Sequence, residues 1–331
     1  IAPVFQLPEP RRAEMTQPTT LKWLRRLWTP LFLLASFAFL YPHAESLASS
    51  LVSVRLQEPW HVLSAIVAQT LSWTLLALGW QALLAIRLGR SIPTTFALGH
   101  LALLSLGKYI PGKLWGMIAR GSRLGRIGIQ AGEAVDATAL EQVLVLHSAA
   151  IISAIFLLAA IPGPWSLLLS LLAVASILFA PLAVGIALSA LSRLASYMRA
   201  GAGNSPRLAM GTRDYATLLG RYSLAWLAHG LALVAILASL RGEIPDLPTC
   251  GLLVFANTAA VVVGFAAIFA PAGLGVRETT LAGLLSLQLG IEDAIILSIA
   301  MRLWTVLTDL GLGGISLYLG RIRGNREGSN A

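Results

Sequence analysis

The chain has 331 residues, of which 56% are hydrophobic and only 12% are charged, about half the charged fraction of an average soluble domain. This composition excludes an ordinary water-soluble domain and indicates one polytopic membrane domain. The formal net charge of +9 fits basic cytoplasmic loops and contact with anionic lipids, so we expect no nucleic-acid partner. One cysteine and five scattered histidines exclude a disulfide framework and predict neither a metal site nor a cofactor.

Apolar segments of roughly 20 residues, the length that crosses a bilayer, recur along the chain and predict an all-α fold. A polar N-terminal tail (1–26) and a polar C-terminal tail (321–331) are both expected in the cytoplasm. Between them, residues 27–320 are expected to form a single lipid-translocating transmembrane domain. The six full spans that we predict are residues 28–46, 60–86, 134–161, 165–191, 215–240 and 294–319.

Two further apolar regions do not fit simple spans. Residues 92–106 are short and end at a Pro-Gly break, and residues 249–270 are followed by a second break and a short apolar run at 279–290. Basic and acidic loops alternate as expected only if region 92–130 enters and leaves from the cytoplasm and region 249–290 from outside. Broken helices at membrane depth are tolerated where they line a wet cavity. We therefore expect two re-entrant hairpins, as in an inverted repeat with the substrate site between them, unless 249–270 simply crosses the membrane.

The first break lies in the stretch "GKYIPGKLWGMIAR". Pro111 and Gly112 interrupt a helix and free backbone N–H groups, which bind anions. Basic side chains on both sides supply charge for a phosphate, and aromatic side chains favour the membrane interface. The residues expected to contact lipid phosphate here are Lys108, Tyr109, Lys113, Trp115 and Arg120. The alternative is a basic loop that only orients the protein.

The second break lies in the stretch "FAPAGLGVRETT". Pro271, Gly273 and Gly275 interrupt the helix, since glycine permits positive φ and close backbone approach. Arg277 and Glu278 follow as further candidates for substrate contact. Because adjacent residues on a helix face different directions, these two are expected to have separate partners. The alternative is an ordinary loop with a glutamate that starts a helix.

Three of the charged residues within predicted spans, where charge is costly and needs a partner or a cavity, are candidates for ion pairing or coupling. They are Glu141, Arg302 and Asp309. Arg302 and Asp309 are seven residues apart, which places them on one helix face but about 10 Å apart along the axis, too far for a direct pair. Two interpretations remain open: structural ion pairs, Glu141–Arg302 or Asp309–Arg277, or proton binding by Glu141 or Asp309 that couples transport to a gradient.

Four stretches occur in the order and approximate spacing of one family: "LGKYIPGKLWGMIARGSRLGRIGI", "EAVDATALEQVL", "APAGLGVRETTLAGLL" and "RLWTVLTDLGLG". The chain resembles the lysylphosphatidylglycerol synthase transmembrane-domain family, the lipid-flipping membrane portion of bacterial multiple peptide resistance factors, over residues 27–320. The resemblance implies a multi-pass inner-membrane protein that moves an amphipathic anionic lipid between leaflets. It assigns lipid contact to Lys108, Lys113, Trp115, Arg120, Arg277 and Glu278. Because no aminoacyl-transferase domain follows Gly320, synthesis of an aminoacyl lipid is not expected.

Three classes of function remain. The first is a flippase for an anionic phospholipid or a polyprenyl-phosphate-linked sugar. It would be driven by a gradient or membrane potential, because the sequence has no Walker motif. The second is a membrane-embedded lipid transferase with Glu141 or Asp309 as base, although no catalytic constellation is visible and we do not expect an enzyme. The third is a non-transporting partner of glycosyltransferases.

Overall fold

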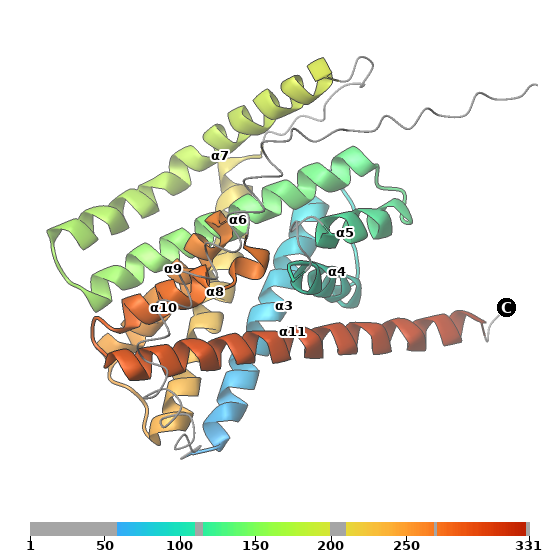
Figure 1. Cartoon of the computed structure of the whole chain (residues 1–331). Coiled ribbons are helices and arrows are strands. Elements are labelled where there is room, and N and C mark those ends of the chain that lie inside the picture. Colours follow the sequence, from blue (N-terminus) through green and yellow to red (C-terminus); the bar gives the residue numbers. More distant parts are fainter. Residues whose placement is uncertain (1–57, 110–114, 199–209, 268–269, 329–331) are drawn as a thin grey trace, which may run out of the picture.

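The computed structural model describes residues 58–109, 115–198, 210–267 and 270–328, and every element within them is helical (Figure 1). The predicted span at 28–46 lies outside the described residues. In chain order the elements are α3 (Trp60–Leu88), α4 (Thr94–Gly107), α5 (Trp115–Gly125), α6 (Ala131–Ala160), α7 (Pro164–Met198), α8 (Thr212–Arg241), α9 (Leu247–Ala266), the 3₁₀ helix η2 (Pro271–Gly273), α10 (Val276–Leu285) and α11 (Ile291–Gly328).

Five of the described helices are long and apolar enough to cross a membrane. Four of them, α3, α6, α8 and the Ile291–Ser316 part of α11, confirm helices at predicted spans. The fifth is α9, so the segment expected to form the first arm of a hairpin has the length of a full span by itself. The predicted span at 165–191 lies within the helix α7.

The two irregular regions each fold into a helical hairpin with a tight contact near its tip. In the first hairpin, α4 lies against α5, and a Cβ added to Gly116 would lie 2.7 Å from the carbonyl oxygen of Leu103. In the second, α9 lies against α10. Gly273 has a φ of +67°, and a Cβ added to it would lie 2.9 Å from the carbonyl oxygen of Gly264. A side chain at either position would push the two arms apart, so both hairpins depend on glycine for their close packing.

The helix bundle has one end rich in carboxylates and one end rich in arginines. At the acidic end, the start of α3 meets the end of α8 through the Glu58 N–H and the Ser239 carbonyl, and Arg241 pairs with Asp293 at the start of α11. The other carboxylates at this end are Glu243, Asp246 and Glu292. The basic end collects the residues at the end of α3, in α5 and at the start of α8: Arg87, Arg90, Arg123, Arg126 and Arg213. Asp136 and Asp214 also lie at the basic end, so the two ends differ in net charge, as the loop pattern predicts.

Helix α8 forms the centre of the bundle and packs along α3. The two helices approach closely at Gly79, where an added Cβ would lie 2.6 Å from the ring of Tyr222, so only glycine lets the aromatic ring fit. Leu83 and Leu218 are fully buried in the same interface. This rigid pair provides one wall against which the two hairpins and α11 are placed.

Candidate functional site

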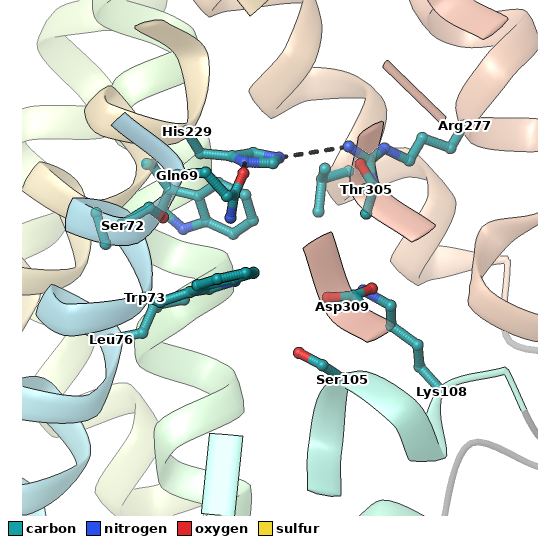
Figure 2. A pocket seen from close by; sticks show the side chains of 13 residues that line it. Gln69, Ser72, Trp73, Leu76, Ser105, Lys108, His229, Arg277, Thr305 and Asp309 are labelled. Carbon is teal, nitrogen blue, oxygen red and sulfur yellow. Dashed lines mark hydrogen bonds and ion pairs between the residues drawn. The ribbon is translucent and has the colours of Figure 1, made fainter. Parts of the chain in front are cut away.

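A cavity of about 140 Å³ lies in the middle of the bundle, between the two hairpins (Figure 2). This volume holds several water molecules, so it suits a headgroup fragment and not a whole lipid. Six helices contribute to its wall, and both hairpins are among them. The lining residues are Gln69, Ser72, Trp73 and Leu76 of α3, Ser105 and Lys108 of α4, Ala225, Trp226 and His229 of α8, Val261 of α9, Arg277 of α10, and Thr305 and Asp309 of α11.

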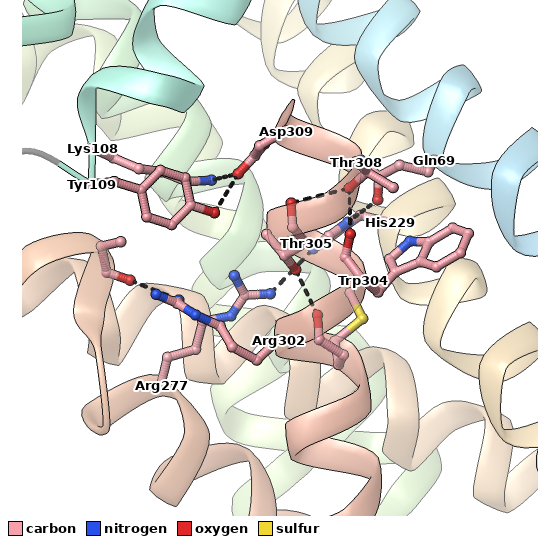
Figure 3. Close-up of polar contacts among 12 residues, drawn as sticks. Gln69, Lys108, Tyr109, His229, Arg277, Arg302, Trp304, Thr305, Thr308 and Asp309 are labelled. Atoms are coloured by element: carbon pink, nitrogen blue, oxygen red, sulfur yellow. Dashed lines mark hydrogen bonds and ion pairs between the residues drawn. The ribbon is translucent and has the colours of Figure 1, made fainter. Parts of the chain in front are cut away.

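Asp309 ties the first hairpin to α11 (Figure 3). Its carboxylate is 2.6 Å from Nζ of Lys108 and accepts a hydrogen bond of 2.7 Å from the hydroxyl of Tyr109. Both partners lie at the end of α4, directly before the break. A carboxylate that is only 5% exposed needs such partners, because an unpaired buried charge is very costly. Two of the predicted contact residues thus hold the hairpin tip in place.

Arg302 connects α11 to the second hairpin and reaches toward the first. Its Nη1 is 3.2 Å from Oε1 of Glu278 and donates a 3.3 Å hydrogen bond to the carbonyl oxygen of Ala272, at the second break. Its guanidinium carbon is 5.7 Å from the centre of the Tyr109 ring. Glu278 also accepts a hydrogen bond from the backbone N–H of Gly275, so it starts α10 as the alternative interpretation expects. One arginine side chain therefore links both hairpin tips.

Arg277 is placed differently from its neighbour. Its Nη2 is 3.4 Å from Nε2 of His229 and 3.4 Å from Oδ1 of Asn257. His229 is in turn 3.0 Å from the side-chain oxygen of Gln69 through Nδ1, so this network requires the tautomer with hydrogen on Nδ1. Among the described residues, no carboxylate lies within 4.0 Å of the Arg277 guanidinium. The prediction that Arg277 and Glu278 have separate partners is confirmed.

The predicted ion pairs were wrong in their partners. Asp309 pairs with Lys108 and not with Arg277, and Arg302 pairs with Glu278 and not with Glu141. Glu141 has its own partner, described below. The linear spacing of charges does not reveal which charged side chain of each hairpin is turned toward α11. The absence of a direct Arg302–Asp309 pair is confirmed.

Arg120 and Glu141 form a buried ion pair between α5 and α6. Both guanidinium Nη atoms contact the carboxylate, one of them at 3.1 Å, and the guanidinium lies 3.3 Å from the ring centre of Trp80. The Trp80 indole donates to Nδ1 of His100, 3.1 Å away. Arg120 is 1% exposed and does not line the cavity. Its position is that of a structural anchor for the first hairpin.

The remaining predicted residues have mixed positions. Trp115 starts α5 and is about half exposed, away from the cavity wall. Pro271, Gly273 and Gly275 lie in the second break as expected. Pro111, Gly112 and Lys113 lie outside the described residues.

Several cavity residues were not predicted as site residues. Gln69, Ser72, Trp73 and Leu76 form one face of α3, with spacings of three, four and seven residues. Trp226 joins them from α8, and Asn257 from α9 holds Arg277. The available signal was the polar Gln69 one turn before Trp73 within an apolar span, because a polar side chain inside a membrane helix points to a partner or a cavity.

Comparisons with known proteins place this geometry in a family. The family model described as the lysylphosphatidylglycerol synthase TM region matches residues 27–313. A search of curated proteins returned no match to the chain. The matched segment contains both hairpins and all the residues that line the cavity. The chain therefore belongs to the lysylphosphatidylglycerol synthase transmembrane-region family.

Proposed function

We propose that this multi-pass membrane protein moves an anionic lipid between the leaflets of the bacterial inner membrane. Family membership indicates a membrane protein with a lipid-related function. The observation that carries the finer proposal is the positively charged cavity between the two hairpins. Two cations and one carboxylate line it, which leaves one net positive charge; they are Lys108 and Arg277 against Asp309.

A charged headgroup crosses hydrocarbon slowly because its charge loses hydration there. A polar cavity at the centre of the bundle replaces part of that hydration. Arg277 suits the phosphate, since a guanidinium can bind two phosphate oxygens at once. Its present contacts to His229 and Asn257 are long, at 3.4 Å each, so an anion can compete with them at small cost.

The ion pairs at the hairpin tips provide two gates in this proposal. Lys108–Asp309 fastens the first hairpin and Glu278–Arg302 the second, both to α11. A headgroup that enters from the basic end would exchange with the first pair, and one that leaves at the acidic end with the second. In this proposal the basic end faces the cytoplasm, in accord with the positive-inside rule.

A leaflet-exposure assay in proteoliposomes tests the proposal. Fluorescent phosphatidylglycerol would be reconstituted with wild type, with Arg277→Gln, and with the control Arg241→Gln, whose arginine is 39% exposed in the pair at the acidic end. Wild type and control should expose the probe rapidly. Arg277→Gln should slow exposure of the probe at least about tenfold, because it removes one charge-assisted hydrogen bond to the phosphate. Equal rates with and without protein would refute transport, and a new covalent lipid product would favour a transferase.

A further inference from the structure

The cavity has two chemically different sides (Figure 2). On one side lie the charged groups Lys108, Arg277 and Asp309, contributed by the two hairpins and α11. On the other lie neutral side chains of α3 and α8, with Gln69 and Trp73 facing the gap in Figure 2. A ligand that fills the space must match both sides at once, so the walls restrict the chemistry of the headgroup.

The charged side binds anions and offers nothing to an ammonium group. Asp309 contributes the only carboxylate among the cavity-lining residues, and Lys108 and Tyr109 already hold it at 2.6 and 2.7 Å. Arg277 faces the same space without a carboxylate partner among the described residues. An ammonium placed here would therefore meet like charge, and it would lose its hydration without gaining an ion pair.

The neutral side offers hydrogen bonds and aromatic surface. The side-chain oxygen of Gln69 is engaged with His229, which leaves its amino group as a donor toward the cavity. The Trp226 indole N–H is bonded to the carbonyl oxygen of Val145, 2.8 Å away, so the ring is fixed and its apolar surface forms part of the wall. Trp73 supplies a second indole. Aromatic faces with nearby amide and hydroxyl groups suit a group that has C–H surfaces and hydroxyls.

We infer that the cavity selects a lipid whose phosphodiester carries a neutral, hydroxylated headgroup, such as a glycerol, an inositol or a sugar, and rejects headgroups with an ammonium. The phosphate binds at Arg277, and the hydroxylated group lies between Trp73 and Gln69. The inference rests on the proposed function, because the selected lipid is the one that would be transported. The headgroup selectivity itself can be measured by binding alone.

Equilibrium binding in detergent tests the headgroup selectivity separately from the proposed transport. Dihexanoyl phosphatidylglycerol, dihexanoyl phosphatidylinositol and a short-chain polyprenyl-phosphoryl hexose represent the expected class and distinguish its three sources. Dihexanoyl phosphatidylethanolamine, phosphatidylcholine and lysyl-phosphatidylglycerol carry an ammonium. At least one lipid of the first group should bind at least about tenfold tighter than each of the second. Equal or tighter binding of any ammonium lipid overturns the inference, and phosphatidylcholine is the sharpest case because two indoles can also hold a choline.

Variants locate the selectivity. Trp73→Ala should reduce the preference at least about fivefold, whereas Trp165→Ala, which removes a tryptophan that is 76% exposed at the start of α7, should leave it unchanged. An unchanged preference in folded Trp73→Ala contradicts the inference; if that variant does not fold, the preferences of wild type still decide. Selective binding without translocation in vesicles supports the inference while refuting the flippase. Translocation without any headgroup preference supports the flippase and refutes the inference.

Discussion

The buried pair Arg120–Glu141 allows a quantitative prediction about how the first hairpin is held. The guanidinium is 1% exposed, contacts both carboxylate oxygens and stacks on Trp80 at 3.3 Å. Removal of one partner leaves an uncompensated buried charge, which costs about 3–5 kcal/mol. Glu141→Leu and Arg120→Met should each lower the free energy of unfolding by about that amount. For Arg120→Met the lost stacking adds up to about 2 kcal/mol.

The double variant Arg120→Met/Glu141→Leu should be much more stable than the sum of the single variants predicts. Replacement of both charges by apolar groups removes the desolvation cost as well as the attraction, and is often neutral or stabilising by about 1–4 kcal/mol. Equilibrium unfolding in mixed micelles, followed by tryptophan fluorescence, gives all four corners of the double-mutant cycle. Additive losses in the double variant, or single losses below about 1 kcal/mol, would refute the interpretation of the pair as a buried anchor.

Three further predictions concern the hairpins and the span ends. Gly116→Ala should lower the melting temperature by several degrees, because its Cβ would lie 2.7 Å from a backbone oxygen, whereas Gly121→Ala, which faces open space, should not; equal effects would contradict the tight α4–α5 contact. Arg302→Lys keeps the charge but cannot hold both hairpin tips in one geometry, so translocation should fall while the melting temperature changes little. The Thr249 hydroxyl and N–H lower the pKa of Asp246, the N-cap of α9. A carboxylate with a depressed pKa stabilises the folded state above its unfolded pKa and loses this effect as pH falls through the folded value, so Asp246→Ala should destabilise the protein at pH 7 and destabilise it less as the pH falls through that range in unfolding experiments.

The long helices could be predicted from the sequence because each apolar run is long enough to satisfy its backbone hydrogen bonds within one span. Helices α3, α6 and α8 follow directly from this pattern. The hairpins could be located by their Pro and Gly breaks, since a break must be placed where protein or water satisfies the freed backbone groups. The expected position of the site between the two breaks agrees with the cavity.

The pairing of charges could not be predicted, because it depends on how close the hairpin tips come to α11. Lys108 and Asp309 are 201 residues apart in sequence and 2.6 Å apart in space. In the sequence, Arg120 cannot be distinguished from the other basic residues of its stretch. In the structure it lies on the buried face of α5 and bonds to Glu141. Trp73 was missed because an aromatic residue in an apolar span gives the same signal whether it faces lipid or a cavity.

Chemical blockade of the cavity tests most directly that the headgroup passes between the hairpins. Ser105 lines the cavity on α4, and Ser122 is exposed on α5 outside it. In a Cys250→Ser background, which removes the only native cysteine, Ser105→Cys and the control Ser122→Cys would be treated with a charged methanethiosulfonate reagent in proteoliposomes. We predict that the label stops translocation of phosphatidylglycerol only in the Ser105→Cys variant, and that a reductant restores it. Unchanged translocation by fully labelled Ser105→Cys protein would contradict a route through this cavity.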